Sequence, residues 1–371
     1  MNINYFNSTR ILDGGMGQEL LARGLKPKGT LWSAHALIDK GCHQMVINAH
    51  LDFINAGAEA IVTTTFTARR NRLIQNDCEK YFEKINIKAV ELALKARDIS
   101  KKEVLVAGGL PNQKQTYSAD LGEDLGSIEK NFYDQAKLLK HGIDFFYLDV
   151  MSSGLECKIA LGAIESFNLP VLVGVHLSDN GLLPSGEKIQ DIVKKYKNKK
   201  WLGIIMACIS PKAYEVVIND LQKLDMPYGF KLNAFNKIPK GYTVASKDAW
   251  GNAGNPTTVL GKNTDLNESK FYEYVKKFMK NGATILGGCC EIRPSHIKEI
   301  SKLKVGEYTK PITIPGGFLI ILLSGKKTEN VYLNFDEELE KQITYEKNTQ
   351  LEQYSTIYFK KIFLRRLIFL A

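Results

Sequence analysis

The sequence predicts an α/β protein, a (β/α)8 TIM barrel with an atypical C-terminal tail. Eight short apolar runs alternate with segments whose apolar residues recur at helical spacing, which is the pattern of repeated strand and helix units. The alternation extends over about 300 residues, the size expected of such a barrel, whereas a doubly wound open sheet normally uses fewer strands. Residues suited to catalysis stand at the ends of several runs, where enzymes of this fold keep their active sites.

The predicted strands and helices follow one another in a regular order. Strands are predicted at residues 10–13, 60–64, 104–107, 145–149, 171–175, 202–207, 228–232 and 284–288. Helical spacing is clearest at residues 36–56, 79–99, 127–140 and 267–280. Asp13 stands at the end of the first strand, Asp149 of the fourth, Cys208 of the sixth, and Cys289 and Cys290 of the eighth. We therefore expect these side chains on the face of the barrel that carries active sites.

The pattern changes from about Lys304 onward, so we assign residues 1–304 to the barrel and 305–371 to a C-terminal appendage. Pro311, Pro315 and Gly316 interrupt the chain there. An apolar run (318–323), an acidic segment (336–340) and a basic and apolar terminus (359–370) follow. The appendage packs on the barrel, mediates association or stays partly disordered, and the sequence does not decide between these roles. Contact of the terminus with a membrane surface is the less favoured interpretation.

Composition narrows the class of protein. The chain has 371 residues, 44% of them hydrophobic, which is enough for a sizeable core, and only six cysteines. We find no signal peptide and no apolar run of the length that spans a membrane, so we expect a cytoplasmic protein. The net charge is +10, but the lysines are scattered and form no compact basic and aromatic patch, so no nucleic-acid partner is expected.

The stretch Gly287-Gly288-Cys289-Cys290 is the strongest indication of chemistry. Adjacent cysteines form a poor disulfide pair but a good clamp for a soft metal, provided that the backbone departs from the regular pleat, which the glycines allow. A catalytic zinc site needs at least three protein ligands. Cys208 is the candidate third ligand because it ends an apolar run. Cys42, Cys78 and Cys157 are interpreted as small buried hydrophobic residues.

Several separated motifs resemble the homocysteine S-methyltransferase family. They are Ile11-Leu12-Asp13-Gly14-Gly15-Met16-Gly17, Leu31-Trp32-Ser33-Ala34, the stretch from His50 to Ala58, Ile61-Val62-Thr63-Thr64-Thr65-Phe66, and the stretch from Gly282 to Cys290 with Pro294 and His296 after it. They occur in the family's order and cover residues 8 to 303, without the tail.

The resemblance implies a barrel in which three cysteine thiolates hold Zn²⁺ and a methyl group passes to the sulfur of homocysteine, giving methionine. Cys208, Cys289 and Cys290 match the ligand positions, and Asp13 matches a position that helps to hold the amino-acid substrate. Two departures stand out. Met206-Ala207-Cys208 lacks the asparagine that usually precedes the third ligand, and Asp149 replaces a glutamate on the fourth strand.

Three thiolates leave one tetrahedral position on zinc for the substrate sulfur, whose thiolate form is the nucleophile. We expect Asp13 and Asp149 to pair with the ammonium group of the acceptor. Asn233, which follows the seventh strand, is a further substrate-binding candidate. Its alternative role is to satisfy backbone groups of its loop, as Asp13 alternatively caps the turn before residues 16–22.

The methyl donor is expected to be a small sulfonium or ammonium compound such as S-methylmethionine, S-adenosylmethionine or betaine. Two other functions stay open. The acceptor could be another thiol or a selenol, and a non-catalytic barrel could use the cysteines in a closed structural zinc site, which requires a fourth protein ligand. The sequence leaves the oligomeric state open.

Overall fold

The computed structural model describes residues 1–26, 28–238 and 255–304, the short segments 312–314 and 317–319, and scattered residues between 340 and 355. The chain divides into two units, Met1–Ile320 and Ile321–Ala371. Most of the predicted appendage lies outside the described residues, so its boundary at residue 305 and its role stay predictions. None of the helices in the described part of the chain is long and apolar enough to cross a membrane.

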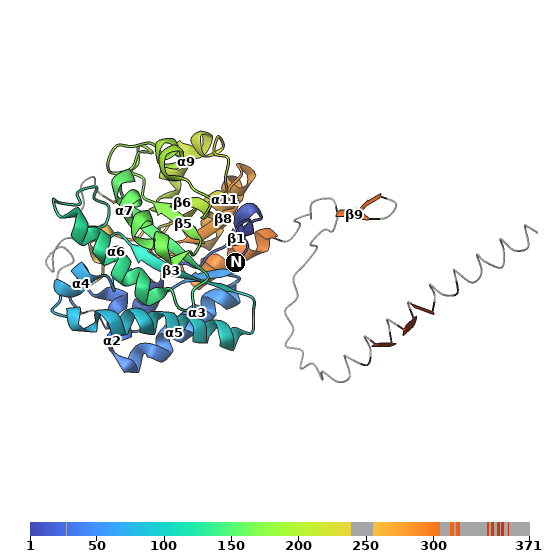
Figure 1. Cartoon of the computed structure of the whole chain (residues 1–371), viewed down its shortest axis with the longest axis horizontal. Helices are drawn as coiled ribbons and strands as arrows, with labels where there is room; N and C mark the ends of the chain where they lie inside the picture. Colours follow the sequence, from blue (N-terminus) through green and yellow to red (C-terminus); the bar gives the residue numbers. More distant parts are fainter. Residues whose placement is uncertain are drawn as a thin grey trace, which may run out of the picture. The chain divides into compact units, whose positions relative to one another are not determined.

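Eight parallel strands form the barrel that the sequence predicts (Figure 1). They are β1 (Arg10–Ile11), β2 (Ala60–Val62), β3 (Leu105–Pro111), β4 (Phe145–Met151), β5 (Val171–Val175), β6 (Trp201–Ile209), β7 (Tyr228–Leu232) and β8 (Ile285–Gly288). From β2 to β8 each strand pairs with the next one in the sequence, and β1 pairs with β8. A parallel bridge between Leu12 and Ala60 joins β1 to β2 and closes the ring.

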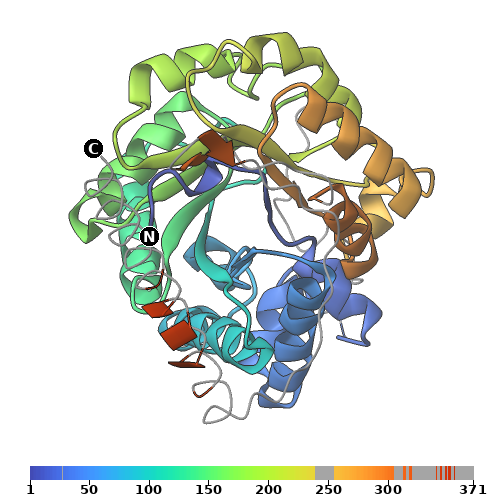
Figure 2. The same cartoon turned by 90° about the vertical axis from the view of Figure 1, so that its right-hand side faces the viewer.

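The helices form an outer layer around the strands, which Figure 2 shows along the barrel. They are α1 (Met16–Ala22), α2 (His35–Ile38), α3 (His43–Ala56), α4 (Arg70–Ile74), α5 (Phe82–Ser100), α6 (Leu125–Leu139), α7 (Gly154–Ile164), α8 (Ile189–Tyr196), α9 (Pro211–Leu221), α10 (Thr257–Leu260), α11 (Glu268–Lys280) and α12 (Pro294–Ser301). The predicted helix at 36–56 is broken, because Asp39 caps a separate 3₁₀ turn, Lys40–Cys42, between α2 and α3. Strands β9 (Ile312–Ile314) and β10 (Gly317–Leu319) pair antiparallel with each other.

The core has two layers, as a barrel surrounded by helices requires. The larger layer lies between the strands and the helices. The smaller one fills the barrel with large side chains, among them Phe145, Tyr147 and Ile205, all fully buried. Phe6, from the 3₁₀ turn Tyr5–Asn7, belongs to this inner cluster and packs edge-on against Phe145. The barrel interior is therefore packed, and its chemistry belongs to one end.

Three strands, β3, β4 and β6, continue past the ends that the sequence predicts, and β4 and β6 are irregular there. β4 runs to Met151 and its register against β5 shifts after Leu148, while the register of β6 against β7 shifts around Cys208. Val150 and Cys208 have positive φ angles of 63° and 53°. Asp149 and Cys208 are thus not the last residues of their strands. A local departure from the pleat turns the chain at these positions, and apolar periodicity does not reveal it.

A substitution at Gly229 tests the pairing of β7 with β8, on which closure of the barrel depends. A β-carbon at this position would lie 1.8 Å from the carbonyl oxygen of Ile285, so Gly229→Ala must separate β7 from β8. We expect the free energy of unfolding to fall by about 3 kcal/mol or more, measured by urea denaturation. Gly162→Ala is the matched control, because its β-carbon on the exposed face of α7 meets nothing closer than 3.9 Å and should stabilise the helix. Equal stability of the two variants would contradict this account.

Candidate metal centre

Three cysteines from two distant parts of the chain meet at one end of the barrel. Cys208 lies near the end of β6, and Cys289 and Cys290 follow β8. The Sγ atom of Cys290 lies 3.7 Å from that of Cys208 and 3.9 Å from that of Cys289, and all three atoms lie within 4.8 Å of one another. Zinc–sulfur bonds of about 2.3 Å in a tetrahedral arrangement would place sulfurs about 3.8 Å apart. The predicted ligand set is therefore together, at a spacing that fits a metal ion.

The turn after β8 brings the two adjacent cysteines to the same side. β8 ends at Gly288, so both cysteines lie beyond the regular pleat, as their convergence requires. The backbone N–H of Cys289 donates to the carbonyl of Leu232 at 2.6 Å, and the carbonyl of Cys290 accepts from the N–H of Ala234 at 2.9 Å. Both hydrogen bonds anchor this turn to the end of β7.

The two glycines before the cysteines serve close packing, which differs from our expectation of backbone freedom. Neither has a positive φ angle. A β-carbon at Gly288 would lie 2.2 Å from Cγ2 of Ile292, and one at Gly287 would lie 2.9 Å from Cβ of Leu12 and 3.2 Å from Cγ of Lys231. Only glycine leaves room for these neighbours, so the pair fixes the turn by its small size.

The three buried thiols affect one another's protonation. Burial alone would raise the pKa of Cys208, but hydrogen bonds from Cys289, Cys290 and Tyr117 hold it well below its usual value. The Tyr117 hydroxyl lies 3.1 Å from the Cys208 sulfur. The pKa values of Cys289 and Cys290 are raised well above their usual value, first by their hydrogen bonds to Cys208. A bound cation is what would favour three thiolates here, because adjacent negative charges repel one another.

Asp13 forms a buried ion pair with Lys231 of β7. Lys231 Nζ donates to Oδ1 of Asp13 at 2.6 Å, and the backbone N–H of Val62 donates to Oδ2 at 2.7 Å. The Asp13 and Lys231 side chains are only 2% and 6% exposed. Burial alone would lower the pKa of Lys231, but Asp13 and then Asp149 raise it above its usual value. The lysine is therefore a buried cation that is paired with Asp13 and further favoured by the negative charge of Asp149.

Asp149 faces the same region from β4. The Tyr147 hydroxyl donates to Oδ1 of Asp149 at 2.7 Å. Burial raises the pKa of Asp149 to about 6, against the lowering effects of Lys231 and of the Tyr147 hydrogen bond. The carboxyl group is thus ionised above that pH, without a direct ion pair among the described residues.

Asn233 supports the cluster through the backbone. Its Nδ2 donates to the carbonyl of Cys208 at 2.6 Å, and its Oδ1 accepts from the N–H of Phe235 at 3.1 Å. His176, which directly follows β5, contacts the same segment. Its ring Nδ1 lies 3.2 Å from the carbonyl oxygen of Ala207. These bonds hold the backbone on both sides of the Cys208 sulfur. Contact of Asn233 with a substrate stays a prediction.

One cavity connects the cysteines with the charged groups. Asp13, Asp149, Lys231 and all three cysteines line it. Its remaining wall is rich in aromatic side chains, namely Trp32, Phe66, Tyr117 and Phe235. Trp32 can lie there because Gly17 has no side chain: a β-carbon at Gly17 would meet the indole at 2.1 Å. The cavity thus offers a soft-metal site, fixed charges and aromatic faces together.

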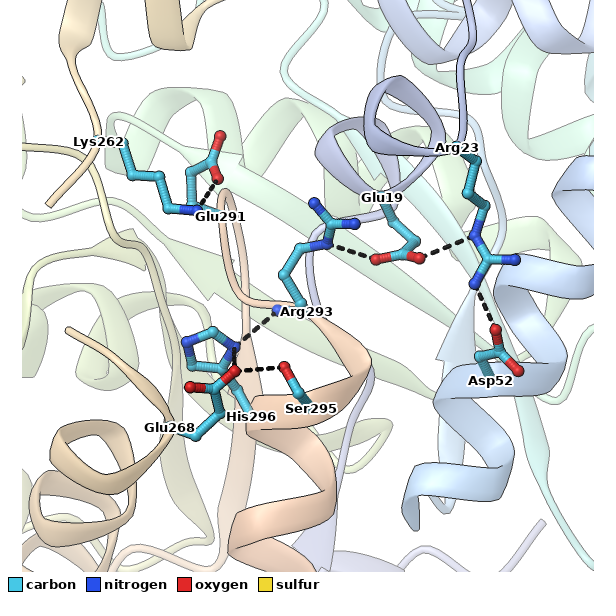
Figure 3. A network of polar contacts seen from close by, with 9 residues as sticks. All are labelled: Glu19, Arg23, Asp52, Lys262, Glu268, Glu291, Arg293, Ser295 and His296. Atoms are coloured by element: carbon cyan, nitrogen blue, oxygen red, sulfur yellow. Dashed lines mark hydrogen bonds and ion pairs between the residues drawn. The ribbon is translucent and has the colours of Figure 1, made fainter. Parts of the chain in front are cut away.

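Behind the cysteine turn, ion pairs tie the segment after Cys290 to neighbouring elements (Figure 3). Glu291 accepts from the Thr257 hydroxyl at 2.7 Å and pairs with Lys262 at 3.3 Å. Arg293 pairs with Glu19 of α1, which also pairs with Arg23. The turn is therefore held from both sides. Cys289 and Cys290 line the cavity, whereas Glu291 and Arg293 are not among its lining residues.

The structure adds three polar residues that the sequence analysis misses: Lys231, Tyr117 and His176. Lys231 gives a sequence signal, since it is the one charged residue in the apolar strand Tyr-Gly-Phe-Lys-Leu, and buried parallel strands are normally continuous apolar runs. Tyr117 lies outside the helices and strands and gives no such signal. Cys42, Cys78 and Cys157 do not join the metal-binding group found within the described ranges.

Comparisons with known proteins agree with this arrangement. A family model described as homocysteine S-methyltransferase matches residues 10–303. Homocysteine S-methyltransferase 2 of Zea mays is 26% identical, with 79% of this chain and 88% of that protein covered. Selenocysteine methyltransferase of Astragalus bisulcatus is 23% identical, with 79% and 91% covered. The metallated crystal structure of the homocysteine methyltransferase MmuM from Escherichia coli has the same fold, with a TM-score of 0.64, 20% identity, and 80% and 96% of the chains covered.

Removing only one of the two buried charges of the Asp13–Lys231 pair should destabilise the fold. Lys231→Met leaves the Asp13 carboxylate buried without its cation, and we expect the free energy of unfolding to fall by about 3–5 kcal/mol. The double variant Asp13→Asn/Lys231→Met should recover most of that loss, because it removes both buried charges. Lys277→Met breaks an exposed pair with Glu215 and should cost less than about 1 kcal/mol. Urea denaturation of the wild type and the three variants measures these differences. A Lys231→Met variant as stable as Lys277→Met would show that Asp13 and Lys231 do not form a buried ion pair.

Proposed function

The chain belongs to the homocysteine S-methyltransferase family, and we infer that it methylates the thiol of homocysteine to give methionine. The observation that carries this function is the cluster of Cys208, Cys289 and Cys290 at the wall of a cavity that also holds fixed charges. A thiol acceptor needs its sulfur as thiolate, and its pKa in water is about 8.5. A metal beside an open cavity meets that need.

We propose zinc as the metal. Three sulfur ligands at the observed spacing suit a soft tetrahedral ion, and a fourth position facing the cavity suits the acceptor sulfur. When bound, zinc would favour the thiolate form of the acceptor at neutral pH. Tyr117 and Asn233 hold Cys208, the former at its sulfur and the latter at its carbonyl. These contacts support a ligand set that is in place before the acceptor arrives.

The carboxyl groups of Asp149 and Asp13 would bind the ammonium group of the acceptor. Asp149 is the main candidate because it has no ion-pair partner among the described residues, whereas Asp13 is already paired with Lys231. Asp13 nevertheless keeps acceptor capacity, since a carboxylate offers about four lone-pair sites and two hydrogen bonds are made. The protein's main contribution is then to hold the acceptor sulfur in line with the donor methyl group.

The donor would be a small sulfonium or ammonium compound. The faces of Trp32, Phe66 and Phe235 at the cavity support this proposal, because aromatic faces attract cations, especially away from water. Methyl transfer breaks the bond between the methyl carbon and the donor's sulfur or nitrogen. The donor keeps that electron pair and becomes neutral at this atom, while the acceptor sulfur forms the new bond.

The two alternative functions are methylation of another thiol or selenol and a non-catalytic barrel with a structural zinc site. A relative named selenocysteine methyltransferase supports a different thiol or selenol acceptor, although the same cluster would serve either. A closed structural zinc site requires a fourth ligand, and within the described residues the metal-binding group consists of three cysteines. A cytoplasmic location also stays a proposal, which the six unpaired cysteines support.

The metal is tested by substitution of one ligand. Purified protein should contain about one zinc per chain, and Cys290→Ser should lose most of the metal and of the methyl-transfer activity, because a catalytic site needs all three protein ligands. Cys42→Ser is the matched control. Cys42 lies apart from the cluster beside Asp39, so the variant should keep both metal and activity. Metal content by mass spectrometry and methionine formation are the measurements. Full activity in zinc-free protein would rule out this mechanism.

The reaction itself is tested with a panel of donors. We expect methionine to form from homocysteine with at least one of S-methylmethionine, S-adenosylmethionine and betaine. Dimethyl sulfide should give none, because it lacks the positive charge that aromatic faces attract and that makes the methyl group transferable. Chromatography of the products measures the outcome. A zinc-loaded protein that forms methionine from none of the three cations would remove the proposed donor class.

A further inference from the structure

We propose that Lys231 recognises the carboxylate of the acceptor, so that it selects thiols bearing a carboxylate group. This inference rests on the proposed function and deepens it, because it assigns a specificity-determining residue within the same cavity. Neither the motifs in the sequence nor the metal cluster requires a lysine here. Lys231 is suited to this role by its position, by its unused hydrogen-bond donors and by the charges around it.

The position of Lys231 is fixed by its neighbours. In the sheet it lies between Ala207 of β6 and Gly287 of β8. A β-carbon at Gly287 would lie 3.2 Å from Cγ of Lys231, so the missing side chain gives the lysine stem its room. The ammonium group reaches Asp13, which follows β1, and lies 5.8 Å from the centre of the Tyr147 ring. The same cavity contains Cys289, so an acceptor sulfur at the cluster would be close to this cation.

The ammonium group has hydrogen-bonding capacity that the protein does not use. A lysine ammonium has three N–H donors. Within the described part of the chain, Asp13 is its one hydrogen-bond partner, although Lys231 is only 5% exposed. Unsatisfied donors on a buried charged group are unfavourable, and a carboxylate is the ligand group that best satisfies them. A ligand carboxylate entering the cavity would therefore gain charge-assisted hydrogen bonds without displacing Asp13.

The charges in the cavity assign the ammonium and the carboxylate of the acceptor to different residues. The Asp13–Lys231 pair is neutral as a unit, so Asp13 attracts a second ammonium group less strongly than a lone carboxylate would. Asp149 lacks an ion-pair partner among the described residues and can attract the acceptor ammonium. Lys231 is the cation that attracts the carboxylate. An amino-acid thiol thus matches the cavity with its ammonium toward Asp149 and its carboxylate toward Lys231.

The test removes one charged group from the ligand at a time. Homocysteine, 3-mercaptopropylamine, which lacks the carboxylate, and 4-mercaptobutanoate, which lacks the ammonium, are compared in the zinc-loaded protein. In the wild type, loss of the carboxylate should lower kcat/KM by about 10- to 100-fold, the effect of losing a charged hydrogen bond. In Lys231→Met this penalty should fall below about threefold, because the cation is already gone. The penalty for losing the ammonium should not fall in Lys231→Met, because Asp149 is unchanged and Asp13 has lost its cationic partner.

A second variant keeps the test informative if Lys231→Met is too unstable to purify. Asp13→Asn/Lys231→Met removes both charges of the pair and should also lose the carboxylate penalty. Lys231→Arg keeps a cation and should retain at least part of it. An equal carboxylate penalty in the wild type and in the folded variant without the cation would overturn the role of Lys231, as would a wild type that uses 3-mercaptopropylamine as well as homocysteine.

Calorimetric binding of the same thiols to the zinc-loaded protein separates this inference from the proposed function. If no thiol is methylated, the methyltransferase assignment fails, while the difference in Kd between homocysteine and 3-mercaptopropylamine still tests Lys231. If homocysteine and 3-mercaptopropylamine are methylated equally well, the methyltransferase assignment stands and the inference about Lys231 fails. The expected result is a Kd for 3-mercaptopropylamine at least about tenfold weaker in the wild type.

Discussion

The seam between the first and last strands of the barrel is the constraint on which the site depends. β1 pairs with β8, and the carbonyl of Asp13 accepts from the N–H of Gly288 at 3.0 Å. The N–H of Gly15 donates to the carbonyl of Ile292 at 2.8 Å just beyond it. These bonds hold the first-strand motif against the turn that carries Cys289 and Cys290. Residues from opposite ends of the barrel sequence therefore become neighbours only because the ring closes.

Backbone strain is concentrated around the same cavity. Eight non-glycine residues in the described part of the chain have positive φ angles. Four of them, Trp32, Tyr117, Val150 and Cys208, belong to the side-chain cluster that contains Cys290, and a fifth, Glu291, directly follows Cys290. Such conformations cost about 1–3 kcal/mol each and are most unusual for a β-branched residue such as Val150. The surrounding packing and the hydrogen bonds to Asn233 and His176 hold the chain in these conformations, which set the direction of the Cys208 and Asp149 side chains.

The sequence predicts most of the fold and the grouping of Cys208, Cys289 and Cys290, because both leave local signals. Apolar runs identify the strands, and adjacent cysteines identify the metal-binding turn. The register shift between Leu148 and Met151 arises from backbone conformation, which composition does not encode, so the end of β4 is misplaced by two residues. Lys231 is visible as a charge in an apolar strand, but its partner Asp13 is 218 residues away. Only closure of the barrel reveals that pair.

The buried lysine also affects the charge balance that the chemistry requires. Among the described residues that line the cavity, Asp13 and Asp149 carry negative charges and Lys231 and Arg72 positive ones, so the side-chain charges cancel. With a divalent ion bound, three thiolates would add a net charge of about −1. The negative charge would then belong to the metal and its sulfurs rather than to the cavity wall. A cationic donor would be attracted toward the acceptor sulfur, while the acceptor's own carboxylate would still find a cation to bind.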